Sequence, residues 1–310
     1  MSSPTLAVTL GDPRGIGPEI AAAVAEDAGR SAPASLRFVG PGNLLPGPGV
    51  SVGEWTGGGD AEAGRLSGLA IERAVEMARS GEVGGIVTAP IHKGALRAAG
   101  WRQPGHTELL RDLFDVPEVG MLMAAERTAV GDAPLRVLLA TTHLALRDVP
   151  DAITPGLLRG QARLLEGALR RWWGISRPRI ALCALNPHAS DGGLFGSEEG
   201  RVMEPAVARL RAEGVDLAGP LPADTVFVRT LRGEFDAVIV PVHDVAMAAF
   251  KTVSFGAGVN VTLGLPVPRT SPDHGTAFDI AGQGIADPSS MREAVRLAAR
   301  LASRTALEPA

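Results

Sequence analysis

The stretch 179-RIALCALNPHASDGGLFG-196 joins an apolar run to a glycine-rich loop, with a histidine just after the junction. The run 179–185 is apolar after its first residue, as in a strand buried on both faces. His188 follows three residues later, and the glycines beyond it suit a backbone that must approach a ligand closely. A single histidine in a loop means little, so its meaning depends on how the other strands end.

Three other apolar runs also lead directly to a histidine: 83-VGGIVTAPI-91 to His92, 136-RVLLATT-142 to His143, and 235-FDAVIVPV-242 to His243. In open α/β sheets the ligand crevice lies outside the carboxyl ends of the strands. His143, His188 and His243, if they meet there as neutral imidazoles, would form an open site for a divalent metal. A capping or packing role remains the alternative for each histidine taken alone.

Apolar runs of strand length alternate with helical patterns along the 310 residues, which indicates an α/β protein with mainly parallel strands in two lobes. The expected strands are 5–10, 83–88, 135–141, 179–185 and 235–240, and the expected helices are 66–80, 154–173, 201–213 and 290–303.

The composition is that of an ordinary soluble protein, with 45% apolar and 21% charged residues. The N-terminal sequence lacks the pattern of a signal peptide and no apolar run has membrane-spanning length, so we expect a cytoplasmic protein. The net charge of −4 and the lack of a basic stripe argue against nucleic acid as a partner. Cys183 is the only cysteine, which excludes a disulfide framework and cysteine-based zinc sites.

Of the 30 basic residues only Lys93 and Lys251 are lysines, and such rare lysines can mark places that need a titratable ammonium, although chance explains either one equally well. The chain has no tyrosine, no HExxH, no GxSxG and no GxxxxGK[ST]. A metal flanked by Lys251, Asp224 and Asp244 would suit oxidation of an alcohol, an aldol-type cleavage or a hydrolysis. These residues alone do not choose among the three.

The loop 273-DHGTAFDIAGQGIADP-288 lacks a Rossmann GxGxxG but closely resembles the adenosine-binding loop of isocitrate and isopropylmalate dehydrogenases. The resemblance implies a cofactor contact through His274, Gly275, Asp279 and Ile280, with His274 mainly shaping the loop. A carboxylate at Asp279 would accept hydrogen bonds from a ribose diol and repel a 2′-phosphate, so NAD is favoured over NADP.

Seven motifs along the chain together form a specific pattern: GDPRGIGPE (11–19), PIHKG (90–94), GHTE (105–108), TTHLALRDVP (141–150), LNPHASDGGLFGSEE (185–199), GPLPADTVF (219–227) and GVNVTLGLPVPRTSPDHGTAFDIAG (258–282). Through these motifs the chain, from residue 5 to about 290, is similar to the 4-hydroxythreonine-4-phosphate dehydrogenases of pyridoxine (vitamin B6) biosynthesis.

This similarity implies a metal bound by His143, His188 and His243 in a site shared across a homodimer. It also implies five substrate-binding residues, namely His106, Thr107, Lys251, Asn260 and Arg269. It assigns no ligand role to His92, for which a structural role is expected. Zinc fits three histidines best, although magnesium, manganese or cobalt would serve the reaction. Asp224 and Asp244 are expected as polar partners of the substrate or of the metal-bound histidines.

The implied architecture is the two-lobed isopropylmalate dehydrogenase fold, with residues 1–125 and 250–310 forming the NAD-binding lobe. Residues 126–249 would form the lobe for metal, substrate and dimerisation. The implied reaction oxidises the 3-hydroxyl of 4-phosphohydroxy-L-threonine, with the metal and Lys251 stabilising the alkoxide while hydride passes to NAD. Loss of carbon dioxide then gives 3-amino-2-oxopropyl phosphate.

One departure from the family pattern lies beside the metal site, where Val245-Ala246 replaces the usual Gln-Gly. Two alternatives therefore stay open. The chain could be a sister dehydrogenase acting on phosphorylated threonate or erythronate, or on an aromatic cis-dihydrodiol. It could also be a metal-dependent lyase or hydrolase, or a ligand-binding protein without catalysis, although an intact Asp279 loop favours a dehydrogenase.

Overall fold

A computed structural model describes residues 3–31, 34–131, 133–254 and 256–305 of the chain. Its contacts divide the chain into two compact units, residues 1–117 with 259–310 and residues 118–258. The sequence placed these boundaries at 125/126 and 249/250. The difference arises because strand β5 (Gly120–Ala125) pairs with β6 (Leu135–Leu139) of the second unit, and because helix α9 (His243–Ser254) continues past residue 249.

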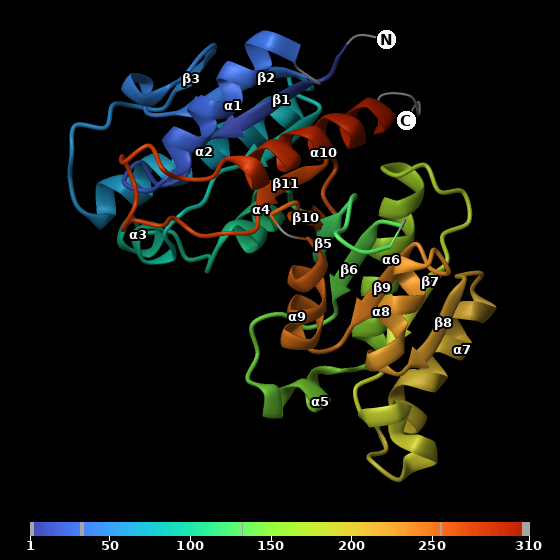
Figure 1. Ribbon diagram of the computed structural model, residues 1–310. Helices are drawn as coiled ribbons and strands as arrows, with labels where there is room; N and C mark the ends of the chain where they lie inside the picture. Colours follow the sequence, from blue (N-terminus) through green and yellow to red (C-terminus); the bar gives the residue numbers. More distant parts are fainter. Residues whose placement is uncertain (1–2, 32–33, 132, 255, 306–310) are drawn as a thin grey trace. The chain divides into compact units, whose positions relative to one another are not determined.

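The first unit has strands in the order β3-β2-β1-β4-β11-β10, and all neighbouring pairs are parallel except β10 with β11. Strands β1, β2 and β3, in blue, lie side by side in Figure 1. Helix α2 packs on β1 and β2, while α10 packs on β4, β10 and β11. The strands are β1 (Thr5–Thr9), β2 (Ser35–Gly40), β3 (Gly49–Ser51), β4 (Gly85–Thr88), β10 (Val259–Leu263) and β11 (Arg269–Pro272). The helices are α1 (Gly17–Ser31), η1 (Gly42–Leu44), α2 (Asp60–Arg79), α3 (Lys93–Ala98), α4 (His106–Phe114) and α10 (Ser289–Thr305).

The second unit has strands in the order β5-β6-β9-β7-β8, with β5 antiparallel to β6 and the other neighbours parallel. Besides β5 and β6, its strands are β7 (Ile180–Cys183), β8 (Leu217–Leu221) and β9 (Ala237–Val240). Besides α9, its helices are η2 (Leu146–Asp148), α5 (Val149–Ala152), α6 (Pro155–Arg171), η3 (Pro187–Gly193), η4 (Glu199–Met203), α7 (Glu204–Ala212) and α8 (Ala223–Leu231).

The predicted class, a mainly parallel α/β protein, is confirmed by both units. Strands β4, β6, β7 and β9 are buried along their whole length, as their continuous apolar runs require. Helix α6 begins where its sequence indicates, because the Thr154 hydroxyl accepts a hydrogen bond from the Leu157 N–H at 3.1 Å and Pro155 occupies the first turn. In the described part of the chain, no helix is both long and apolar enough to cross a membrane.

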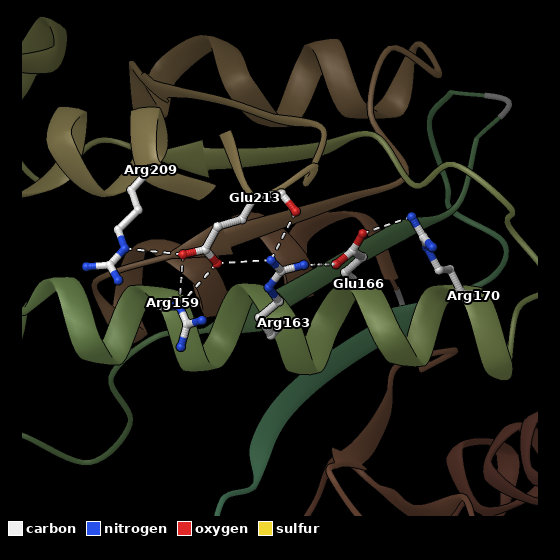
Figure 2. A network of polar contacts seen from close by, with 6 residues as sticks. All are labelled: Arg159, Arg163, Glu166, Arg170, Arg209 and Glu213. Carbon is white, nitrogen blue, oxygen red and sulfur yellow. Dashed lines mark hydrogen bonds and ion pairs between the residues drawn. The ribbon is translucent and has the colours of Figure 1, made fainter. Parts of the chain in front are cut away.

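An arginine–glutamate network joins α6 to the end of α7 in the second unit (Figure 2). Glu213 lies at its centre and pairs with Arg163 at 2.9 Å, with Arg159 at 3.2 Å and with Arg209 at 3.2 Å. Arg163 also contacts Glu166 at 3.0 Å. These pairs connect the end of α7 to α6.

Candidate functional site

The central strands of the second unit bring two of the predicted metal ligands together. Strands β6 and β9 are parallel neighbours, so their carboxyl ends lie at the same edge of the sheet. His143 follows β6 and His243 follows β9, and their ring centroids are 5.6 Å apart. Both rings line a pocket of about 110 Å³ together with Thr142, Val149 and other residues of the same loops. Two imidazoles at this spacing can face one small ligand.

Asp244 orients one of these two rings. Its Oδ1 lies 2.8 Å from Nδ1 of His243, and its side chain is otherwise exposed. A carboxylate on Nδ1 leaves Nε2 of His243 as the atom that can bind a cation, an arrangement common around metal-binding histidines. Asp244 is therefore a partner of His243 in the structure, and its expected role beside the substrate or a metal-bound histidine stays a prediction.

His188 follows β7, the other neighbour of β9, and lies in an unusual turn. Residues His188 to Asp191 all have positive φ, between 45° and 68°, although none of them is glycine. Left-handed backbone in non-glycine residues costs free energy, and such strain concentrates at ligand sites. This turn holds His188 on the surface beside Phe195, with their rings 6.5 Å apart.

Glu199, which the sequence analysis gave no role, holds this turn. It is almost fully buried, and its Oε1 accepts hydrogen bonds from the backbone N–H groups of Leu185 at 2.8 Å and Asn186 at 2.7 Å. Its Oε2 accepts from the Asn186 amide at 2.9 Å and from the Ser190 hydroxyl. Burial opposes its ionisation, but these hydrogen bonds outweigh burial and keep the pKa of Glu199 below its ordinary value.

The three predicted metal histidines do not converge within one chain. Among the described residues, no group of three His, Cys, Asp or Glu side chains could hold a metal ion. The geometry thus brings His143 and His243 together and leaves His188 apart from them. A two-histidine site with an oriented Nε2 has donors of the type that zinc and similar metals prefer, but it needs a further ligand.

The remaining predicted residues of this unit lie on exposed helix positions. Asp224 is in the first turn of α8, and Lys251 lies on α9, eight residues or about 12 Å along the helix axis from His243. Ala246, where the family pattern has glycine, is fully buried in the core of the unit, while Val245 is 36% exposed.

In the first unit, Arg269 is the largest fully buried side chain and has no acidic partner among the described residues. Its Nη1 donates to the Thr262 hydroxyl at 3.1 Å and its Nη2 donates to the Thr88 hydroxyl, while its Nε has no partner. Burial lowers the pKa of Arg269 to about 9. A buried guanidinium held only by neutral hydroxyls keeps its charge for an incoming anion.

Two more of the predicted substrate residues carry polar atoms without partners near this arginine. Asn260 and Thr262 are two residues apart on β10, so their side chains point to the same face of the sheet. Thr262 lies opposite Arg269 on β11, and the Arg269 side chain is therefore on that face as well. The Asn260 Oδ1 and the His106 Nε2 are buried and unpaired. Burial, together with the charge of Arg269, lowers the pKa of His106 well below its ordinary value. Thr107 follows in the first turn of α4.

The loop 273–288, named the cofactor loop from here on, is fixed to the segment 11–19. The Ile16 N–H donates to the Thr276 carbonyl at 3.0 Å, and the Glu19 carboxylate accepts from Gly282 N at 2.8 Å and Ala286 N at 3.2 Å. A Cβ on Gly15 would lie 2.7 Å from the Thr276 carbonyl oxygen, so only glycine permits this approach.

This attachment leaves the predicted cofactor residues of the loop open to a ligand. The Asp279 side chain is exposed, and Gly275 has open space where a side chain would be. Ile280 is half-buried, and its N–H donates to the Ala277 carbonyl at 3.2 Å. His274 has a buried Nε2 without a partner, while its Nδ1 lies 3.2 Å from the Gly275 carbonyl oxygen. An exposed acid and a bare backbone fit the ribose diol and phosphates of a dinucleotide.

The chain is similar to proteins of a known family. The family described as pyridoxal phosphate biosynthetic protein PdxA matches residues 31–298. The chain belongs to this family. A 4-hydroxythreonine-4-phosphate dehydrogenase of Paracoccus denitrificans is 52% identical over 236 residues, which cover 76% of this chain and 72% of the relative. The resemblance inferred from the sequence motifs is thereby confirmed.

Two further relatives bear on structure and substrate. The crystal structure of 4-hydroxythreonine-4-phosphate dehydrogenase from Klebsiella pneumoniae has a TM-score of 0.86 at 38% identity, covering 97% of this chain and 98% of that one. A Bradyrhizobium diazoefficiens protein named for D-threonate 4-phosphate dehydrogenation is 42% identical and covers 98% of both chains. PdxA-family relatives therefore carry more than one substrate name.

The fold extends beyond the family. Isocitrate dehydrogenase from Methylococcus capsulatus has a TM-score of 0.51 at 17% identity, covering 97% of this chain and 88% of that one. This likeness concerns the fold alone, and it confirms the predicted isopropylmalate dehydrogenase-like class without a Rossmann fold.

Proposed function

We propose that this PdxA-family chain is an NAD-dependent and metal-dependent 4-hydroxythreonine-4-phosphate dehydrogenase. It would oxidise 4-phosphohydroxy-L-threonine at the 3-hydroxyl, with decarboxylation to 3-amino-2-oxopropyl phosphate in pyridoxine 5′-phosphate biosynthesis. The observation that carries the proposal is the buried Arg269, which has no acidic partner among the described residues and lies beside the unpaired polar atoms of His106 and Asn260. This cluster suits a small anionic and polar substrate.

The substrate's phosphate or carboxylate would bind at Arg269. Its Nε is free to donate to an anionic oxygen, while Thr88 and Thr262 hold the other two nitrogens. The depressed pKa of His106 keeps its imidazole neutral at neutral pH, so it can exchange hydrogen bonds with the substrate without adding charge. Asn260 would add a polar contact from the same sheet face, and Thr107 a hydroxyl.

His143 and His243 would hold the divalent metal, with the third histidine, His188, supplied across a homodimer. A bound metal would polarise the substrate hydroxyl and carbonyl oxygens during oxidation and decarboxylation. Asp244, whose Oδ1 lies 2.8 Å from Nδ1 of His243, would leave Nε2 of that ring for the metal. Lys251 would supply an ammonium that donates to the substrate oxygen, and Asp224 a carboxylate that orients the polar groups of the substrate.

The cofactor loop would hold NAD, which accepts the hydride when bound. Asp279 would accept hydrogen bonds from the ribose diol, and Gly275 would allow the backbone to approach the nucleotide. His274 and Ile280 would complete the contact, with the unpaired Nε2 of His274 available for a hydrogen bond.

The test is NADH formation with added divalent metal, using 4-phosphohydroxy-L-threonine as substrate. We expect turnover in the wild type and loss of at least about a hundredfold in His143→Ala and His188→Ala. If the third ligand comes from a second copy, a mixture of these two inactive variants would recover part of the activity through mixed dimers with one intact site. Failure of that mixture to recover any activity would contradict the shared site.

A second candidate substrate is favoured by Val245-Ala246 and by the relative named for D-threonate 4-phosphate. Preferred turnover of 4-phospho-threonate or 4-phospho-erythronate would move the chain to this sister activity, and an aromatic cis-dihydrodiol tests the remaining dehydrogenase alternative. NAD binding without reduction by any of them would leave a ligand-binding protein, and metal-dependent turnover without NAD would indicate a lyase or hydrolase.

A further inference from the structure

A compact cluster around Arg14 lies next to the cofactor loop and has no part in the function proposed so far. The guanidinium of Arg14 donates from Nε and Nη2 to the two oxygens of Asp12, at 2.9 and 2.8 Å, and from Nη1 to Asp60. Asp12 is fully buried, and its own N–H donates to the Pro90 carbonyl at 2.9 Å. A two-point contact to a buried carboxylate fixes the plane of the guanidinium.

This fixed guanidinium supports an aromatic ring of the cofactor loop. The Arg14 Cζ lies 5.2 Å from the ring centroid of Phe278, within the range of a cation–π contact. The edge of the same ring meets His92, with centroids 5.4 Å apart and planes at 65°. His92 is itself fixed because its Nδ1 accepts a hydrogen bond from the Ala95 N–H at the start of α3. Phe278 is therefore held from two sides although it is 43% exposed.

The charges of the cluster suit a positioning role. Two carboxylates surround the one guanidinium, so Arg14 does not offer its charge to a nucleotide phosphate or to Asp279. The hydrogen bond from Arg14 lowers the pKa of Asp60, as expected for a carboxylate paired with a cation. Phe278 immediately precedes Asp279, so fixing the ring also fixes the backbone that carries this acid.

We propose that Arg14 is a positioning residue for the cofactor loop. Held by Asp12 and Asp60, it fixes Phe278 and thereby the direction in which Asp279 presents its carboxylate to the ribose of a nicotinamide dinucleotide. The role in cofactor binding rests on the proposed function, whereas the role in ordering the loop does not.

The first test is a double-mutant cycle on NAD affinity, measured by direct titration of the purified protein. Arg14→Lys keeps the charge but loses the planar fork, and Phe278→Leu keeps an apolar side chain but loses the ring face. We expect each single change to raise the Kd for NAD about tenfold, and the double variant to bind no worse than either, because the two residues act as one unit. The kcat at saturating NAD should stay within about twofold.

Arg65→Lys is the matched control, because Arg65 pairs with Glu62 at 2.7 Å on the exposed face of α2. It should leave the Kd for NAD unchanged. An unchanged Kd in Arg14→Lys, or effects of Arg14→Lys and Phe278→Leu that multiply in the double variant, would overturn the proposal.

The second test separates loop ordering from cofactor binding. Amide hydrogen exchange in the NAD-free protein reports on the N–H groups of Ile280, Gly282 and Ala286, which are bonded in the structure. We expect faster exchange at these amides in Arg14→Lys and no change in Arg65→Lys. If wild type binds no NAD, the cofactor assignment fails while the exchange result still decides the ordering role. Unchanged exchange in Arg14→Lys would refute that role.

Discussion

Arg269 is buried between the hydroxyls of Thr88 and Thr262, and no carboxylate among the described residues balances its charge. Burying such a charge costs free energy in the ligand-free protein, and a bound anion would offset that cost. Arg269→Met, which keeps an unbranched side chain about as long as the arginine stem and removes the charge, should therefore leave the melting temperature unchanged or higher. It should raise the KM for the phosphorylated substrate at least about a hundredfold.

Thermal unfolding and steady-state kinetics of the same preparation check both effects. Arg269→Lys is the control, since it keeps a charge but loses the contacts of the fork, and it should fall between wild type and Arg269→Met in KM. A large drop in melting temperature for Arg269→Met would mean that the arginine supports the fold rather than the substrate.

Glu199 gives a prediction for the turn that carries His188. In Glu199→Gln the amide NH2 would face the Asn186 amide and the Ser190 hydroxyl, so one of the present contacts loses its acceptor. We expect a loss of about 1–3 kcal/mol in the free energy of unfolding and a weaker affinity for divalent metal. Urea denaturation measures the free energy of unfolding, and a metal titration measures the affinity. Glu198→Gln changes a neighbouring partner of Asn186 that is less buried, and it should cost less.

These residues mark how far the sequence alone could lead. The sequence led to His143 and His243 lying close together, because the carboxyl ends of parallel strands meet at one edge of a sheet. His188 lies apart from them within the chain, and metal binding by the three histidines stays a prediction. Arginine is rarely buried and glutamate seldom organises a turn fourteen residues away, so neither the neutral surroundings of Arg269 nor the role of Glu199 follows from local pattern. The family resemblance pointed to Arg269 but not to Thr88 or Thr262.

The place of Ala246 in helix α9 accounts for the alanine in Val245-Ala246. Ala246 faces the core of the second unit beside Phe250 and Val240, so its methyl group fills apolar space within a helix. Ala246→Gly should lower the free energy of unfolding by about 1–2 kcal/mol, from helix propensity and lost burial. Val245→Gln, at a partly exposed position, should cost less than about 0.5 kcal/mol.

Urea denaturation of the two variants checks these values. If Ala246→Gly proves neutral while Val245→Gln alters the preference between threonine and threonate phosphates, residue 245 decides the substrate. Equal and large losses of stability in both would instead place both side chains in the core.

Local sequence signals account for the start of α6 but not for the geometry of every element. The start of α6 followed from Thr154 and Pro155, but the helix predicted at 201–213 is a π-helical segment, η4, followed by α7 with Pro205 in its first turn. Strands β10 and β11 were not predicted as a pair, because their antiparallel contact forms between two runs separated by a proline-rich turn. Loop and pairing geometry of this kind depends on tertiary contacts.

The network around Glu213 predicts that the folded protein loses stability in acid (Figure 2). Hydrogen bonding from Arg163, opposed by partial burial and reinforced by Arg209 and Arg159, lowers the pKa of Glu213 from 4.5 to about 2. Because the folded pKa lies below the unfolded one, the stabilisation is complete above pH 4.5 and disappears as the pH falls toward 2.

Glu213→Gln should therefore melt at a lower temperature than wild type at pH 7, and the difference should shrink as the pH falls from 4.5 toward 2. Glu72 provides a control of opposite sign, because burial and the neighbouring Glu76 raise its pKa. Ionised Glu72 thus opposes folding, and Glu72→Gln should melt slightly higher than wild type at pH 7 and converge with it in acid. Calorimetry at a series of pH values distinguishes these curves. A Glu213→Gln difference that stays constant down to pH 2 would mean that the glutamate acts through packing, since a charge effect must vanish once the carboxylate is protonated.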